Sequence, residues 1–135
     1  MSNPISSYLG FQADALPLRE QRLKLIASNL ANADTPGYRA RDLDFNAALQ
    51  AAGQARQGGR SSHAEPHPDH LALGDIDGLH AFETVRLAAQ PSLDGNTVDP
   101  DAERAAYGRA ALEYRASLNF LESKVRTLLT AITGQ

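Results

Sequence analysis

An unbroken heptad pattern covers the C-terminal part of the chain, and it limits the possible folds more than any other feature. Apolar residues recur there alternately four and three positions apart, which is the a and d spacing of a helix that presents one seam to a partner helix. The seam residues are Tyr107, Ala111, Tyr114, Leu118, Leu121, Val125, Leu128 and Ile132. We therefore expect one long C-terminal helix, paired along this seam with a second helix.

Both ends of this helix carry recognisable signals. Asp99 is a suitable N-cap residue, and Pro100 follows at the first helical position, where its missing N–H is not needed. Gly134 is a suitable C-terminal stop. A helix over residues 101–133 would be about 50 Å long at about 1.5 Å per residue, which is more than the rest of one small domain can cover.

The N-terminal part of the chain repeats the pattern. Leucines recur at seven-residue spacing and form a second seam, at Leu16, Leu23 and Leu30. We expect a helix over about residues 5–32 that pairs antiparallel with the C-terminal helix. Glu20 and Lys24 are spaced for an i, i+4 ion pair. Pro17 predicts a kink, because proline lacks the N–H of the helical ladder.

Each predicted helix also carries apolar residues on the side that faces away from its seam. Such outward positions are usually charged or polar. The outward residues form a second stripe on each helix, at Phe11, Leu18, Leu25, Leu112, Ala116 and Phe120. Two interpretations are open: a three-helix bundle within one chain, or packing of the stripes against neighbouring subunits. We favour intersubunit packing, because the chain offers few other long helices.

Composition excludes several kinds of partner and chemistry. The 135 residues hold 13 Lys and Arg against 16 Asp and Glu, a net charge of −3, and no basic block, so we expect no nucleic-acid partner. There is no Cys, which leaves no disulfide framework and no thiol chemistry. No run is apolar enough to be transmembrane, and residues 1–10 lack the features of a secretory signal.

The sequence divides into three segments that we expect to form one structural unit. Residues 1–34 are the N-terminal helical segment, and residues 99–135 are the C-terminal helix that pairs with it. Residues 35–98 are an irregular middle region, with a flexible linker over about residues 58–70 that is rich in Gly, Ser, His and Pro. The predicted fold class is mainly α, an antiparallel coiled coil of the terminal helices, with a middle region that can hold a small β-hairpin.

Within the middle region, local signals differ in strength. Pro36 and Gly37 suit the centre of a type II turn, and this turn ends the first helix. An extended segment is expected over residues 38–45, and only a weak helix over residues 46–57. Residues 82–87 favour a strand, and the Asp-Gly pair at positions 94 and 95 is typical of a hairpin turn.

Three histidines in the linker are candidates for metal binding. His63, His67 and His70 would share a face on a helix, and histidine is a common zinc ligand. Pro66 and Pro68 forbid that helix, so we expect a solvated linker with no metal site and no cofactor. Two amphipathic helices joined by a polar loop also provide no shaped pocket for a catalytic site, so we expect no enzyme.

The residues around the predicted turn resemble a known family. The stretch Ala27-Ser-Asn-Leu-Ala-Asn-Ala-Asp-Thr-Pro-Gly-Tyr-Arg39 is similar to the N-terminal signature of the bacterial flagellar axial proteins, which are the rod, hook and hook-associated proteins. The following RARDLDF and the stretch from Gln90 to Asp99 are more selective, and they resemble the proximal-rod proteins of the basal body. The signature-turn residues are Asn29, Asn32, Thr35, Pro36, Gly37 and Tyr38.

The resemblance implies a structural subunit of the basal-body rod, the tubular drive shaft that transmits torque and conducts exported subunits. Such chains travel unfolded through the flagellar type III export apparatus, without a cleaved signal, and assemble in the periplasmic span. The implied partners are further copies of the chain, other rod proteins, and the membrane-embedded ring and export gate. The alternative is a soluble helical adaptor or export chaperone of a type III secretion system.

Overall fold

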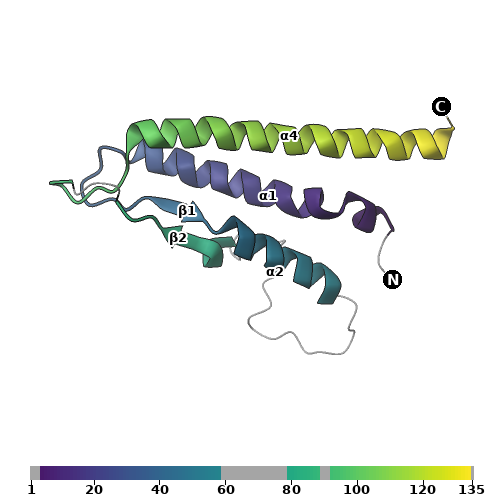
Figure 1. The fold of residues 1–135 in the computed structure, drawn as a ribbon, viewed down its shortest axis with the longest axis horizontal. Helices are drawn as coiled ribbons and strands as arrows, with labels where there is room; N and C mark the ends of the chain where they lie inside the picture. The colour runs from purple at the N-terminus through teal and green to yellow at the C-terminus, as the bar shows by residue number, and fades with distance from the viewer. Residues whose placement is uncertain (1–3, 59–78, 89–91, 135) are drawn as a thin grey trace.

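The computed structural model of the chain describes residues 4–58, 79–88 and 92–134. Its elements are α1 (Pro4–Ala31), β1 (Arg41–Leu43), α2 (Phe45–Gly58), a 3-10 turn η1 (His80–Phe82), β2 (Glu83–Val85) and α4 (Pro100–Thr133). The long helices α1 and α4 lie side by side and run in opposite directions (Figure 1). The predicted mainly α class with long terminal helices is therefore confirmed. None of the helices in the described ranges has the length and apolar character needed to cross a membrane.

Helix α1 is the middle layer of the fold. Helix α4 covers one side of it, and the short sheet with α2 covers the other (Figure 1). Two hydrogen bonds mark the length of the α1–α4 contact: Arg19 Nη1 donates to the Glu113 carbonyl at 2.7 Å, and Lys124 Nζ donates to the Tyr8 carbonyl at 2.9 Å. A helix that is apolar on one side packs against one layer. Helix α1 is apolar on two sides and therefore packs against two layers.

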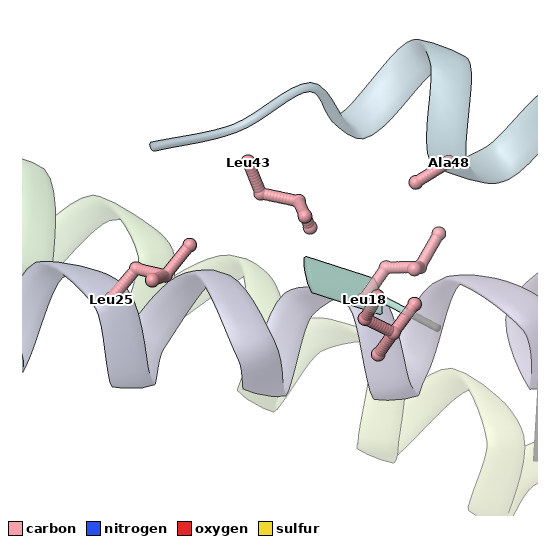
Figure 2. Close-up of a cluster of buried hydrophobic side chains, with 5 residues drawn as sticks. Leu18, Leu25, Leu43 and Ala48 are labelled. Atoms are coloured by element: carbon pink, nitrogen blue, oxygen red, sulfur yellow. The ribbon is translucent and has the colours of Figure 1, made fainter. Parts of the chain in front are cut away.

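The main apolar core lies between α1 and the middle region. Leu18 and Leu25 of α1 pack with Leu43 of β1, Ala48 of α2 and Leu79 (Figure 2). Leu18 is fully buried and Leu25 is 6% exposed. The prediction that these two leucines face a neighbouring subunit is therefore wrong. The middle region of the same chain buries them. The prediction considered only the long heptad-patterned helices as packing partners, and the middle region has none.

The face of α4 that packs on α1 is rotated from the predicted seam. Glu103, Ala110 and Ser117 are buried at seven-residue spacing, whereas Leu118 is 39% and Val125 is 41% exposed. Small side chains at the contact let two helices approach closely, so the larger residues lie beside the contact. Of the predicted α4 seam, the partly buried residues are Ala111, Tyr114, Leu121 and Leu128, and the exposed ones are Tyr107, Leu118, Val125 and Ile132. On α1, the seam residues Leu16, Leu23 and Leu30 are partly buried.

The predicted ends of α4 are confirmed. The Asp99 side chain accepts hydrogen bonds from the amides of Asp101 at 3.0 Å and Ala102 at 3.2 Å, so it caps the N-terminus. Gly134 has φ 70°, and its amide donates to the Thr130 carbonyl at 2.9 Å. A left-handed glycine closes a helix in this way because it has no Cβ to clash.

Helix α1 is interrupted at a different residue from the one predicted. Pro17 lies inside the helix, and the non-helical backbone is at Gly10, with φ 47° and ψ −131°. Glycine adopts a positive φ at little cost, so the chain turns there. The predicted ion pair between Glu20 and Lys24 is present, with an N–O distance of 2.8 Å.

The middle region forms a two-stranded antiparallel sheet, as predicted, but its strands are joined in another way. Arg41 of β1 lies opposite Val85 of β2, and Leu43 lies opposite Glu83. Helix α2 stands between these strands in the chain, and it is longer than the weak helix expected there. Gly95, with φ 76°, belongs to a turn that lies against Gly37 rather than joining the two strands.

Replacing Leu18 by Ala tests the core. We expect the free energy of unfolding to fall by about 2–5 kcal/mol, since a fully buried Leu leaves a cavity when truncated. Urea unfolding followed by circular dichroism measures this. Leu112→Ala is the matched control, because Leu112 is 70% exposed and its truncation should change the free energy by no more than about 0.5 kcal/mol. Equal effects of the two substitutions would contradict the assignment of the core.

Candidate functional site: a polar joint and an exposed apolar face

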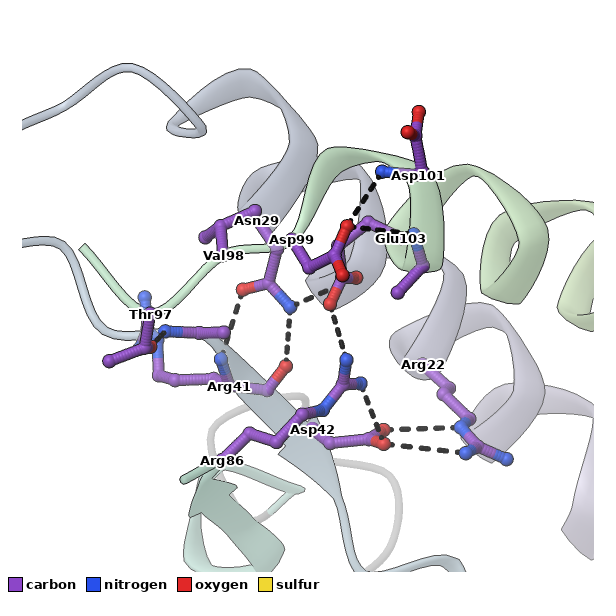
Figure 3. Close-up of polar contacts among 12 residues, drawn as sticks. Arg22, Asn29, Arg41, Asp42, Arg86, Thr97, Val98, Asp99, Asp101 and Glu103 are labelled. Atoms are coloured by element: carbon purple, nitrogen blue, oxygen red, sulfur yellow. Dashed lines mark hydrogen bonds and ion pairs between the residues drawn. The ribbon is translucent and has the colours of Figure 1, made fainter. Parts of the chain in front are cut away.

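The C-terminal end of α1 enters a network of polar side chains, which we call the polar joint. Its members are Arg22, Asn29, Arg41, Asp42, Arg86 and Glu103 (Figure 3). They come from α1, β1, α4 and the position after β2. The joint therefore connects α1 to α4 on one side and to the two-stranded sheet on the other.

Asn29 stands at the centre of the joint and is fully buried. Its amide oxygen accepts hydrogen bonds from the Arg41 amide at 3.0 Å and the Tyr38 hydroxyl at 3.2 Å. Its amide nitrogen donates to the Arg41 carbonyl at 2.7 Å and to Glu103 Oε2 at 3.4 Å (Figure 3). A side-chain amide has one acceptor oxygen and two N–H donors, and here both kinds of group are used. One side chain thus fixes α1 to the start of β1 and to α4.

A chain of alternating charges continues from Glu103. Glu103 is 1% exposed and pairs with Arg86. Arg86 also reaches Asp42 at 3.0 Å, and Asp42 pairs with Arg22 at 3.1 Å (Figure 3). Removing one partner of a buried ion pair leaves an uncompensated charge, which is strongly destabilising. This applies most strongly to Glu103, because the side chains of Arg22 and Asp42 are partly exposed.

Asp42 is kept ionised by this arrangement. Its partial burial opposes ionisation, but hydrogen bonds from Arg22, from the Leu43 amide and from Arg86 outweigh that effect and hold its pKa below the ordinary value of 3.8. A carboxyl group with a lowered pKa stabilises the folded state at pH values above its unfolded pKa. This stabilisation is lost as the pH falls through the folded pKa.

A second buried amide closes the end of α1. Asn96 is 6% exposed, and its amide nitrogen lies 3.0, 2.8 and 2.9 Å from the carbonyl oxygens of Asn32, Ala33 and Thr35. These carbonyls belong to the turn that follows α1, so Asn96 holds this turn against a distant segment of the chain. The signature turn follows directly: the Tyr38 amide donates to the Thr35 carbonyl at 3.2 Å.

Sequence reasoning missed the roles of Asp42, Arg86, Asn96 and Glu103. Asp42 pairs within the chain, with Arg22 and Arg86. Ala110, seven positions after Glu103, lies outside the predicted seam. No local pattern therefore shows that Glu103 is buried or that Arg86 reaches it.

Large apolar residues remain exposed along α4, and we call them the apolar face. They are Tyr107 at 44%, Leu118 at 39%, Val125 at 41%, Leu129 at 56% and Ile132 at 77% exposure. A groove of about 340 Å³, lined by Ala27, Leu30, Ala31 and Tyr107, adjoins this face. Monomeric proteins rarely expose contiguous apolar patches of large size, so the face is suited to contact with a partner.

The remaining outward residues of the sequence prediction are also exposed. Phe11 is 51%, Leu112 is 70% and Phe120 is 58% exposed, and Ala116 is exposed as well. These four side chains are available to neighbours, unlike Leu18 and Leu25.

Within the described ranges no group of three or more His, Cys, Asp or Glu side chains is placed to hold a metal ion. The linker histidines His63, His67 and His70 lie outside those ranges.

Comparison with known proteins points to one family. A family model described as "Flagella basal body rod protein" matches residues 9–39, which include most of α1 and the signature turn. The chain is 39% identical to the flagellar basal body rod protein FlgB of Salmonella typhimurium strain LT2, with 99% of each chain covered. It is 37% identical to FlgB of Escherichia coli K12, covering 98% and 97%, and 41% identical to FlgB of Aeromonas hydrophila, covering 93% and 92%.

Replacing Asn29 by Ala tests the polar joint. The substitution leaves the Arg41 backbone groups without their side-chain partners, and each buried unsatisfied group costs about 1–3 kcal/mol. We expect a loss of about 2–4 kcal/mol in urea unfolding on that basis. The exposed Asn119 provides the control, since Asn119→Ala should stay close to wild type. A loss at Asn29 as small as the control would show that the joint does not hold the fold.

Replacing Asp42 by Asn tests the pH dependence of the joint. The folded-state pKa of Asp42 is lowered, so its contribution is complete above the unfolded pKa of about 3.9 and is lost progressively as the pH falls from there through the folded pKa. Wild type should exceed Asp42→Asn in stability at pH 6–7, and this difference should shrink as the pH falls below about 4. Thermal unfolding at a series of pH values measures the difference. A gap that does not change with pH would contradict the assignment.

Proposed function

The chain belongs to the family of flagellar basal body rod proteins FlgB, and from this premise we propose that it is a structural subunit of the bacterial flagellar rod. The observation that carries the proposal is the identity of 37–41% to named rod proteins over nearly the whole chain. In this role the chain assembles with further copies and with other rod proteins into the drive shaft of the flagellum. The role requires contact surfaces and neither a cofactor nor a catalytic group.

The distribution of exposed residues supports an assembly role. In the part of the chain that the structure describes, α1 is covered on both sides, whereas α4 is covered only on the side that packs on α1 (Figure 1). The apolar face of α4 therefore provides one contact for a neighbouring subunit. Phe11, Leu112, Ala116 and Phe120 provide further contacts, while Leu16, Leu23 and Leu30 serve the pairing within the chain.

We assign the subunit to the basal body, in the periplasmic span of the rod. There it meets the membrane-embedded ring and export gate on one side and other rod proteins on the other. It reaches this place through the flagellar type III export apparatus, without a cleaved signal. The comparisons give no support to the alternative of a soluble adaptor or export chaperone.

Replacing Leu118 by Asp tests the proposal in the source bacterium after deletion of its own gene for this chain. The unaltered chain should restore swimming. Leu118→Asp should not, because it places a charge in the middle of the apolar face. Since Leu118 is 39% exposed, the purified variant should stay folded and lose about 1–2 kcal/mol of its free energy of unfolding, which is part of the value for a fully buried Leu.

The control is Gln50→Glu, which makes the same change of charge at an exposed position of α2 and should swim. Swimming of the Leu118→Asp strain would show that the apolar face is not needed. Failure of the unaltered chain to restore swimming would contradict the rod-subunit function itself.

A further inference from the structure

The first turns of α1 form a separate segment, which we call the arm. The arm covers residues 4–9 and precedes Gly10, whose backbone has φ 47° and ψ −131°. The purple end of α1 in Figure 1 is accordingly set off from the rest of the helix. A residue with a Cβ rarely adopts such a conformation, whereas glycine adopts it at little cost. The direction of the arm is therefore determined at this one residue.

Lys124 of α4 binds the arm close to the break. Its Nζ donates to the Tyr8 carbonyl at 2.9 Å and lies 5.2 Å from the centre of the Tyr8 ring. The last carbonyls before a helix end lose their regular partners within the helix, and a cation is favourable at that end of the helix dipole. Lys124 therefore acts as a C-terminal cap for the arm and, at the same time, as a cation–π partner of Tyr8.

The remainder of α1 is fixed by contacts that lie beyond the break. Ala15 and Leu18 are both 0% exposed. Arg19 Nη1 binds the Glu113 carbonyl of α4 at 2.7 Å. These contacts do not involve the arm, so a change of backbone conformation at Gly10 moves the arm and leaves the core in place.

We infer that Gly10 is a hinge with two positions of the arm. The closed position is the one in the structure, with the arm bent at Gly10 and bound by Lys124. In the straight position Gly10 is helical, and the arm continues the line of α1. The Tyr8 carbonyl then accepts from the Gln12 amide, four residues on, in place of Lys124. Both positions give this carbonyl a partner, and both conformations are open to glycine.

The hinge is independent of the proposed rod function, because it concerns contacts within one chain. Its consequence is that the N-terminal end of the chain can take two places relative to α4 without repacking around Leu18. The balance between them depends on one charge. Removing the charge of Lys124, by substitution or by acetylation of its amine, favours the straight position.

Two spin labels test the hinge in the purified full chain. The natural chain has no Cys, so Ser6→Cys on the arm and Arg109→Cys on α4 accept labels at these positions alone. Pulsed electron spin resonance then gives the distribution of distances between the labels. The closed distance should predominate in the labelled parent. Lys124→Met keeps an apolar side chain without the charge, and it should raise the ratio of straight to closed about two- to fivefold, as expected for one exposed cation–π contact.

Replacing Gly10 by Ala gives an independent measurement on the same labels. Alanine disfavours the closed backbone because of its Cβ, and it is the best helix former. The straight distance alone should remain, and it should equal the distance that grows in Lys124→Met. The control is Arg126→Met, which removes a charge that pairs with Glu122 within α4 and should leave the distribution of the labelled parent unchanged.

Several outcomes would overturn the hinge. One is a single distance shared by the labelled parent and Lys124→Met, since it would show that no straight position exists. Another is a closed distance that persists in Gly10→Ala. A broad distribution without distinct distances, or an equal shift caused by Arg126→Met, would likewise refute the two positions held by Lys124. None of these outcomes bears on the rod function, which the swimming experiment tests.

Discussion

The burial of Glu103 is the constraint on which the arrangement of this fold depends. A carboxylate that is 1% exposed requires partners, and these are Arg86 and Asn29. Arg86 follows β2 and Asn29 lies in the last turn of α1, so Glu103 connects α4 to both. The same arginine pairs with Asp42 of β1. The polar joint therefore links the helix pair to the middle region through Arg86 and Asp42.

The middle region has a clear physical task in this arrangement. Helix α1 is apolar on two sides, and α4 can bury only one of them. Leu43, Ala48 and Leu79 bury the other, around Leu18 and Leu25. Because the middle region of the same chain buries this side of α1, the helix keeps little apolar surface for a partner. The exposed apolar groups are concentrated on α4 instead, and the two helices of the pair have different roles despite their similar heptad patterns.

The sequence was sufficient for the features that depend on local chemistry. The capping of α4 by Asp99 and Gly134 follows from residue types at the helix ends, and the existence of two long helices follows from the heptads. The heptad pattern did not show which side of α4 packs on α1. Its spacing does not tell whether large or small residues face the partner helix, and here the small residues Ala110 and Ser117 do. The burial of Leu18 and the pairing of Glu103 with Arg86 depend on segments far apart in the chain, which no local pattern connects.

The separation of these partners along the chain has a consequence for the order of folding. Asn29 and Glu103 are 74 residues apart, and Arg19 and the Glu113 carbonyl that it binds are 94 residues apart. Contacts of such high sequence separation form slowly, because the intervening loop must close first. A chain that emerges from its N-terminus can pack α1 against the middle region around Leu18 and Leu25, but the contacts of α1 with α4 form only after α4 has emerged as well. The completed fold thus reports that the whole chain has been delivered.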